Sequence, residues 1–385
     1  MKTINKPYYV ILTGSKNNAG DYLIKHRAKT LFSSIREDRY IIDIDGWKPF
    51  DQTTLELVNN SEGLILMGGP ALQKNMYPKV YPLTEDLDDI KCKIVLMGVG
   101  WKSLSGNWSD SQDYAFSEQT LKLLKRIDDD GLINSVRDYH TLNALRHNGL
   151  TKVLMTGCPA TYKLEYFDKE IIKENCFKRV SFSLGVSFLE SDEMKLQMKE
   201  VILKLKQFFS NSKDFYVVFH HSTKAEFLKT HNSKISHLKG HQDFILWLES
   251  ENINYIDISG SAENLIDHYS SVDLHIGYRV HAHIFMNSIS KPSILISEDG
   301  RGKALEKVFS GVIIDGFSRV NGSLIAKILR KLKLKSGYVV NSKTPDEVVN
   351  TLKYEIDNEF PLISRSRKLI DGNFLYMKNF IEALP

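Results

Sequence analysis

The sequence has 385 residues, of which 42% are hydrophobic and 25% are charged, and its formal net charge is +4. This length predicts about two domains, and the composition is typical of a globular protein and excludes a disordered or fibrous one. The small net charge gives no electrostatic reason to expect a nucleic-acid partner.

The chain also gives no sign of export or membrane insertion. No uninterrupted apolar run approaches the roughly 20 residues of a membrane-spanning helix, and the start of the sequence has no apolar signal segment. The three cysteines are widely spaced, which suits a reducing compartment and argues against a cysteine-based zinc site. We therefore expect a cytoplasmic protein, with any membrane contact peripheral.

Short apolar runs alternate with helical segments through the first part of the chain. Strands are predicted at 8–13, 40–44, 63–67, 93–98, 134–136 and 152–155, and helices at about 22–32, 119–126 and 139–148. Buried strands that alternate with helices indicate a parallel sheet covered on both faces. Ligands of such sheets bind beyond the carboxyl ends of the strands.

The alternation starts again after a polar stretch at 163–178. Strands are predicted at 179–186, 215–219, 255–258, 274–277 and 292–296, and helices at 192–209, 244–251, 262–269 and 280–288. The predicted fold class is α/β, with two doubly wound Rossmann-like domains facing a central cleft. We expect an acceptor-side domain at 1–165, a donor-side domain at 166–340, and a helical segment at 341–385 that could pack back on the first domain.

Small and polar residues follow the first predicted strand, where a helix should begin. Asn18 or Asp21 could cap this helix while the backbone around Gly20 meets a ligand. Neither the dinucleotide nor the P-loop glycine spacing is present. A capped turn without a ligand explains the stretch equally well.

Glycines and an aromatic residue follow two further strands of the first domain. Gly68 and Gly69 would permit close approach of a small molecule to the backbone, although a tight turn alone also explains them. Trp101 follows the next strand and could stack on a sugar face, although such an aromatic is more often part of the packing.

An arginine stands at the carboxyl end of the strand at 134–136. Arg137 could bind a carboxylate or phosphate with two parallel hydrogen bonds, which a lysine does less well. The alternative is a surface or capping arrangement with Asp138.

The stretch from 272 to 283 is the most informative, because an apolar strand reaches a glycine and a cation and an imidazole then open a helix. A helix N-terminus attracts anions, so Arg279 and His281 predict an anion site. His281 could also transfer a proton near neutral pH. His275 lies inside the strand and is interpreted as a core residue, and His283 points away from His281 on a helix.

Two further side chains complete the set of expected site residues. Arg301 and Lys303 add cations near a later helix start that Asp299 could cap, and in a two-domain cleft Lys303 would join Arg137, Arg279 and His281. His221, after a strand, could bind phosphate or sugar hydroxyls. Its neighbour His220 points to the opposite face of the strand, so the pair predicts no metal site.

Taken together, these motifs resemble the polysaccharide pyruvyltransferase family. The resemblance spans roughly residues 8 to 310 and rests on five segments that occur in the family's order: Asn18-Ala19-Gly20-Asp21, Gly68-Gly69, Ser135-Val136-Arg137-Asp138, Gly157-Cys158-Pro159-Ala160 and Arg279-Val280-His281. It implies a GT-B-like fold and transfer of a pyruvyl group from phosphoenolpyruvate to two hydroxyls of one sugar, in bacterial surface-polysaccharide biosynthesis. By the same resemblance, Arg137 and Arg279 would hold the donor, His281 would be the general acid, and neither a metal nor another cofactor is expected.

Other interpretations stay open at this point. A GT-B glycosyltransferase would use the same cations for a nucleotide-sugar donor, and a remodelled protein would bind sugar without catalysis. The acceptor could be a saccharide or a lipid-linked saccharide. A basic stretch at 327–335 could then touch an anionic membrane, although a solvated helix face also explains it.

Overall fold

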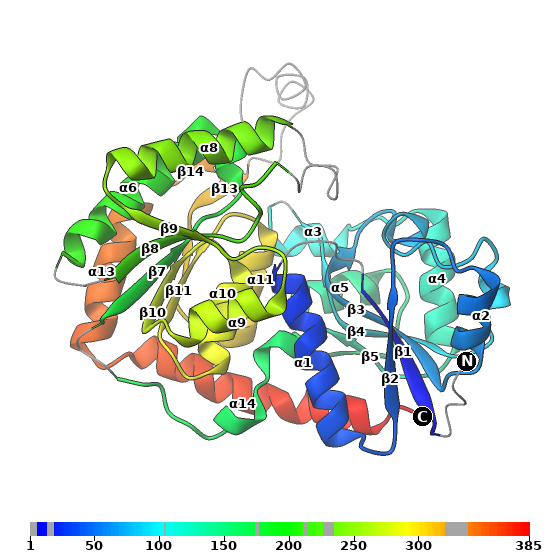
Figure 1. Cartoon of the computed structure of the whole chain (residues 1–385). Coiled ribbons are helices and arrows are strands. Elements are labelled where there is room, and N and C mark those ends of the chain that lie inside the picture. Colours follow the sequence, from blue (N-terminus) through cyan, green and yellow to red (C-terminus); the bar gives the residue numbers. More distant parts are fainter. Residues whose placement is uncertain are drawn as a thin grey trace.

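The computed structural model describes residues 6–13, 19–103, 105–173, 177–210, 214–225, 235–319 and 338–385. Within them the chain forms two six-stranded parallel sheets, in the orders β2-β1-β3-β4-β5-β6 and β12-β11-β10-β7-β8-β9. Figure 1 shows the two sheets side by side, each with helices packed on its faces. The predicted class, α/β with two doubly wound Rossmann-like domains, is confirmed.

The first domain carries the sheet whose strands come first in the chain. Its strands are β1 (Tyr8–Thr13), β2 (Tyr40–Asp45), β3 (Gly63–Leu72), β4 (Ile94–Trp101), β5 (Asn134–Val136) and β6 (Val153–Met155). Its helices are α1 (Ala19–Ile35), α2 (Gln52–Asn59), α3 (Trp108–Gln112), α4 (Glu118–Asp129) and α5 (Tyr139–His147). All 8 residues of β4 are buried, because helices cover both faces of a central parallel strand.

Two strands of this domain run further than the sequence predicts. β3 continues to Leu72 and β4 to Trp101, so the glycines expected to form turns lie inside the sheet. Gly68 and Gly69 have φ values of 26° and 72°, and the pairing of β3 with β4 is irregular between Gly69 and Leu72. Glycine suits this distortion because it adopts positive φ without a steric penalty.

The second domain repeats the pattern. Its strands are β7 (Arg179–Ser183), β8 (Asp214–Phe219), β9 (Asn254–Asp257), β10 (Leu274–Gly277), β11 (Ser293–Ser297) and β12 (Ile313–Asp315). Its helices are α6 (Asp192–Phe208), α8 (Ile235–Ser250), α9 (Ala262–Ser270), α10 (Val280–Ser288), α11 (Gly300–Phe309) and α13 (Thr344–Asp357), and an antiparallel pair joins β13 (Phe317–Arg319) to β14 (Tyr338–Val340).

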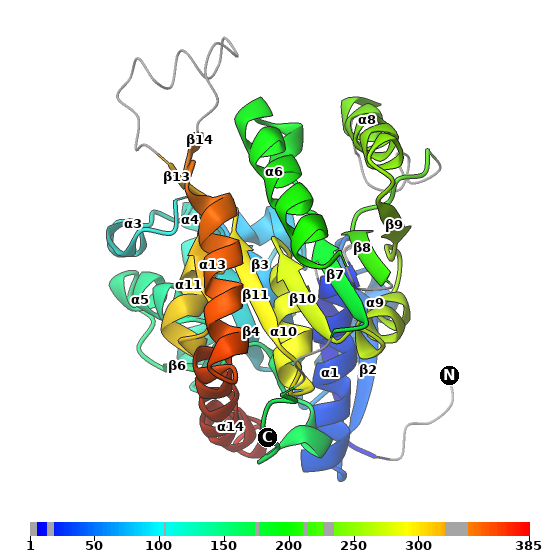
Figure 2. The same ribbon diagram turned by 90° about the vertical axis from the view of Figure 1, so that its left-hand side faces the viewer.

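Helices hold the two domains together. α1 of the first domain packs against α9 and α10 of the second (Figure 1). The last helix, α14 (Pro361–Glu382), follows α13 and packs against α10, α11 and α1 (Figure 2). Beyond its end, the Pro385 carbonyl accepts a hydrogen bond from the Tyr9 hydroxyl and one of 3.2 Å from Arg36 Nη2. The C-terminal segment thus contacts both domains.

None of the helices in the described ranges has the length and apolar character needed to cross a bilayer. The basic stretch at 327–335, which carries the expected membrane contact, lies outside the described residues.

Candidate functional site

The start of α10 places Arg279 and His281 at the junction of the domains. Arg279 is the residue that precedes the helix, and its backbone N–H donates to Ser183 Oγ at 3.0 Å. His281 lies in the first turn. Arg279 is 7% exposed and His281 is 6% exposed, so burial holds both side chains in place.

A glycine of the first domain allows His281 this position. A Cβ atom at Gly20 would lie 2.0 Å from His281 Nδ1 and 2.5 Å from Cγ, which is closer than any real contact. Only glycine therefore fits between the starts of α1 and α10. This contact joins two residues that the sequence predicts for the site from opposite domains.

Arg137 enters the same region from the end of β5 and is 2% exposed. Its guanidinium covers Gly100 of β4, where a Cβ atom would lie 2.3 Å from Arg137 Nε. Nε donates to Asp138 Oδ2 at 3.3 Å, and Asp138 Oδ1 accepts from the Thr141 backbone N–H at 2.7 Å as the cap of α5. The capping and pairing roles foreseen as an alternative are thus present, and Arg137 Nη2 still has no hydrogen-bond partner among the described residues.

Arginines surround the His281 imidazole. Burial lowers its pKa well below the ordinary value of 6.5, and the charges of Arg137, Arg301 and Arg279 lower that pKa further. His281 Nε2 has no hydrogen-bond partner within the described ranges. A neutral imidazole therefore stands among guanidinium groups from both domains, an arrangement that can receive an anion.

A buried carboxylate stands behind Arg279. Glu298 Oε2 accepts from the backbone N–H groups of Val186 and Ser187 at 2.7 and 2.9 Å, and Glu298 Oε1 lies 3.9 Å from Arg279 Nη1. Burial raises the pKa of Glu298, and the charge of Arg279 partly offsets that rise. The pair balances charge without a direct hydrogen bond.

Asp299 fixes the position of Arg301. Asp299 caps α11 through Oδ1, which accepts from the Arg301 backbone N–H at 2.8 Å, while Asp299 Oδ2 accepts from Arg301 Nε at 2.8 Å and Nη2 at 2.5 Å. Asp299 raises the pKa of Arg301, and the charges of Glu298 and Asp21 add to this rise. The sequence predicted the Asp299 cap and a cation at Arg301, but it did not single out Glu298, because two adjacent acids after a strand resemble an ordinary polar turn.

A buried chain of hydrogen bonds begins at Ser183, the residue that binds the Arg279 backbone. Ser183 Oγ lies 2.8 Å from His275 Nε2, His275 Nδ1 lies 2.7 Å from Ser293 Oγ, and Ser293 Oγ lies 2.8 Å from His283 Nδ1. Ser183 Oγ also accepts from the Arg279 backbone N–H. Burial lowers the pKa of both imidazoles, that of His283 to about 3, so His275 and His283 are neutral. His275 is the core residue that the sequence predicts.

The other residues expected at the start of α1 are placed in part. Asn18 lies outside the described residues. Asp21 Oδ1 would lie 3.2 Å from a Cβ atom at Gly69, and Ile24 packs in the same way against Gly68. The glycines of β3 therefore let α1 approach the sheet closely.

The structure corrects the interpretation of Trp101 as a sugar platform. The indole is 0% exposed, and it stacks on His140 at 5.7 Å and meets the edge of Tyr114 at 5.5 Å. Because β4 runs further than predicted, Trp101 ends the strand and packs in the core of the domain.

The contacts described for Lys303 do not include His281. Lys303 Nζ lies 3.5 Å from Asp315 Oδ2. His221 is half-buried. Its neighbour His220 is buried, and burial and then the charge of Arg279 lower the pKa of His220 well below its ordinary value. His220 thus senses the charge of Arg279. Among the described residues, no three His, Cys, Asp or Glu side chains gather as a metal site.

Comparison with curated proteins gives no match. Among solved structures, the chain is similar to UDP-GlcNAc 2-epimerase from Neisseria meningitidis bound to UDP-GlcNAc, with 11% identity and a TM-score of 0.49 over 96% of this chain and 100% of that one. It is also similar to the Methanocaldococcus jannaschii UDP-GlcNAc 2-epimerase in complex with UDP-GlcNAc and UDP, with 12% identity and a TM-score of 0.45 over 90% and 99%. The wall teichoic acid polymerase TagF gives 10% identity and a TM-score of 0.39 over 97% and 88%. Similarities this distant carry no information about the activity.

The sequence profile of one family matches most of the chain. This profile, described as polysaccharide pyruvyl transferase, covers residues 18–300. The matched range takes in the start of α1, Arg137 at the end of β5, and Arg279 with His281 at the start of α10. The resemblance noted from the sequence motifs is thereby confirmed, and the chain is a transferase that belongs to the polysaccharide pyruvyl transferase family.

Proposed function

We propose that this protein transfers a pyruvyl group from phosphoenolpyruvate to two hydroxyl groups of one sugar, in the cytoplasmic biosynthesis of a bacterial surface polysaccharide. The family supports the reaction class. The observation that carries the proposal is that His281 Nε2 and Arg137 Nη2 are buried without hydrogen-bond partners among the described residues. Buried polar atoms are rarely left unpaired in proteins, and a ligand with anionic oxygens would satisfy both.

Phosphoenolpyruvate matches the charges of this site. It carries a carboxylate and a phosphate on one carbon atom, so it needs cations from two directions. Arg137 approaches from the first domain and Arg279 from the second, and a guanidinium binds either group with two parallel hydrogen bonds. In this proposal the two arginines hold the donor against His281.

The reaction needs one proton donor and no redox partner. His281 protonates the methylene carbon of the donor, which leaves an oxocarbenium-like centre at the neighbouring carbon. One sugar hydroxyl attacks this centre and returns its proton to His281, the C–O bond to phosphate breaks with the electron pair leaving on phosphate, and the second hydroxyl closes the cyclic ketal as its proton passes to the released phosphate. The products are the ketal and inorganic phosphate, and cations around the leaving phosphate stabilise its charge.

The donor itself would charge the general acid. In the free protein, burial and three arginines keep the pKa of His281 well below 6.5, so the imidazole is neutral at pH 7. A bound carboxylate and phosphate reverse the sign of the local field and raise this pKa. Proton uptake on donor binding is therefore part of the proposal.

Isothermal titration calorimetry with phosphoenolpyruvate tests the donor. Wild-type protein should bind it at pH 7.5 and take up protons, which appears as a binding enthalpy that changes with the ionisation enthalpy of the buffer. Arg137→Ala should weaken binding about 100-fold, as loss of a charge-assisted bidentate contact costs roughly 3 kcal/mol. Arg146→Ala is the matched control, since Arg146 is exposed on α5 and should leave binding unchanged.

The same titration separates the proposal from its rivals. Failure of wild-type protein to bind millimolar phosphoenolpyruvate would refute the donor assignment. Binding of UDP, GDP or CMP in its place would identify a nucleotide-sugar transferase. If the donor binds, release of phosphate in the presence of sugar acceptors, abolished by His281→Ala, distinguishes an enzyme from a protein that only binds sugar.

A further inference from the structure

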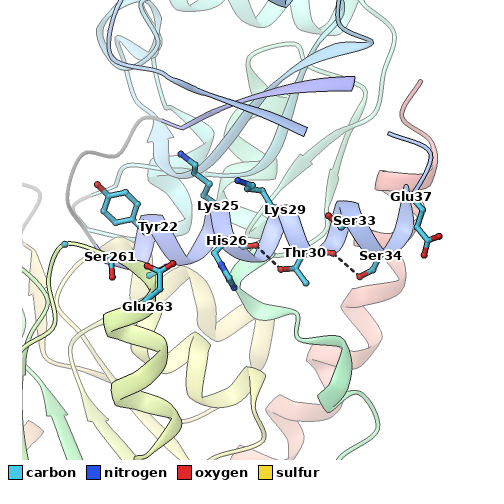
Figure 3. A pocket seen from close by; sticks show the side chains of 12 residues that line it. Tyr22, Lys25, His26, Lys29, Thr30, Ser33, Ser34, Glu37, Ser261 and Glu263 are labelled. Atoms are coloured by element: carbon cyan, nitrogen blue, oxygen red, sulfur yellow. Dashed lines mark hydrogen bonds between the residues drawn. The ribbon is translucent and has the colours of Figure 1, made fainter. Parts of the chain in front are cut away.

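A groove of about 820 Å³ runs along α1 on the side that faces α9. Figure 3 shows Tyr22 and Ser261 at one end of it and Glu37 at the other. The wall on α1 includes Tyr22, His26 and Thr30, whose spacing of four residues keeps them on one face of the helix. The second wall is the start of α9, so both domains line the groove.

One end of the groove lies next to the proposed catalytic centre. Tyr22 is two residues after Gly20, which touches His281. Ser261 follows the carboxyl end of β9, the edge of a parallel sheet where ligands bind. From Tyr22 to the end of α1 the groove extends for about 20 Å, given a helical rise of 1.5 Å per residue.

The charges along the groove are balanced. Lys25 Nζ lies 2.6 Å and Lys29 Nζ 3.8 Å from the carboxylate of Asp43, and Glu37 and Glu263 add two acids to the lining. Phosphate-rich ligands need an excess of cations, which these residues do not provide. The lining also has few apolar side chains, unlike a site for a lipid or a partner helix.

The hydroxyl groups of α1 present acceptors to the groove. Ser34 Oγ donates to the Thr30 carbonyl at 3.0 Å, and Thr30 Oγ1 donates to the His26 carbonyl at 3.1 Å. Each hydroxyl proton is thus used within the helix, and the lone pairs of each oxygen remain for an incoming donor. Ser33 and Ser261 add hydroxyls, and the Tyr22 ring adds an aromatic face.

We propose that this groove binds a neutral oligosaccharide, namely the sugar units of the acceptor that extend beyond the sugar receiving the ketal. The proposal rests on the proposed pyruvyl transfer, because it takes His281 as the point where the reacting sugar sits. Hydroxyl acceptors, an aromatic ring and balanced charge match the chemistry of an uncharged sugar chain, and the length of the groove exceeds that of one sugar.

Binding to immobilised glycans tests the groove. The probes are neutral oligosaccharides of bacterial surface polysaccharides, each printed as a disaccharide and as a longer chain with the same terminal sugar. Ser34→Trp fills the end of the groove far from His281 and should weaken binding of the longer chains at least about tenfold, while the disaccharides bind as before. Ser250→Trp is the matched control, because Ser250 is also exposed on a helix and also donates to a carbonyl of that helix.

Two results would overturn the groove proposal. One is that wild-type protein binds none of the longer glycans, and the other is that Ser34→Trp binds them as well as Ser250→Trp does. Phosphoenolpyruvate titration is run on the same proteins and should give equal affinities, since Ser34 lies far along α1 from Gly20. If wild-type protein does not bind phosphoenolpyruvate, the proposed function is refuted. If it binds phosphoenolpyruvate but not the longer glycans, only the groove proposal is refuted.

Discussion

Replacing Ser183 by alanine should both destabilise the protein and weaken the proposed donor site. Ser183 Oγ accepts from the Arg279 backbone N–H at 3.0 Å and lies 2.8 Å from His275 Nε2. All three residues are buried, so alanine leaves two buried polar groups, the Arg279 N–H and His275 Nε2, without these partners. At roughly 1–3 kcal/mol for each such group, we expect the free energy of unfolding to fall by about 3 kcal/mol.

Ser181 provides the matched control on the same face of the same strand. Ser181 Oγ makes a side-chain contact at 2.9 Å with His268 Nε2, and this contact does not involve the start of α10. Ser181→Ala should cost about 1–2 kcal/mol, and it should leave phosphoenolpyruvate affinity unchanged. Ser183→Ala should in addition lower that affinity about tenfold, because Arg279 loses the acceptor that fixes its backbone.

Urea denaturation followed by circular dichroism gives the stabilities, and calorimetric titration gives the affinities. Unfolding of Ser183→Ala at the wild-type urea concentration would contradict the predicted loss of stability. Equal loss of donor affinity in the two alanine variants would contradict the predicted role of Ser183 at Arg279, since the effect would then be general loosening of the domain.

Three further results are expected. Gly20→Ala should lower kcat/KM about 100-fold with little change in far-UV circular dichroism, since its Cβ atom would lie 2.0 Å from His281 Nδ1 and must displace the imidazole. Glu298→Gln should reduce the urea unfolding free energy by about 3 kcal/mol, because Arg279 loses the carboxylate 3.9 Å away and stays buried. Burial and then the charge of Arg179 lower the pKa of His268 to about 4. The stability that the neutral His268 contributes is therefore present above pH 6.5 and is lost as the pH falls toward 4. From pH 6.5 to 5 this amounts to roughly 2 kcal/mol, and His268→Gln should flatten the fall measured by urea denaturation.

The sequence predicts the strands and helices well because buried parallel strands are short apolar runs between polar turns. β1, β5 and β10 have the predicted bounds. β3 and β4 run further because Gly69 pairs with Val99 and Leu72 with Trp101, although such glycines are typical of turns. The error at Trp101 has the same cause. The sequence predicts Trp101 in a loop after the strand, whereas it is the last residue of the buried strand β4.

Contacts between residues of different domains could not be predicted from local patterns. Arg137 and His281 are far apart in the sequence, and the expectation that they work together rested on the predicted two-domain cleft and on the family resemblance. The contact of Gly20 with His281 depends on how α1 packs on α10, which no local pattern encodes. Similarly, Lys303 and Arg301 look alike as cations at a helix start, and only the structure shows that Arg301 binds Asp299 while Lys303 approaches Asp315.

The ion pairs of the site suggest how its three arginines divide their roles. Each has its own carboxylate, but the contacts differ: Asp299 holds Arg301 with bonds of 2.8 and 2.5 Å, whereas the nearest approaches are 3.3 Å between Arg137 and Asp138 and 3.9 Å between Arg279 and Glu298. When a donor anion displaces a carboxylate from an arginine, the free-energy cost is smallest where the existing ion pair is weakest. In the proposed reaction, Arg137 and Arg279 are therefore the groups that bind the donor, and Arg301 contributes a fixed positive charge beside His281.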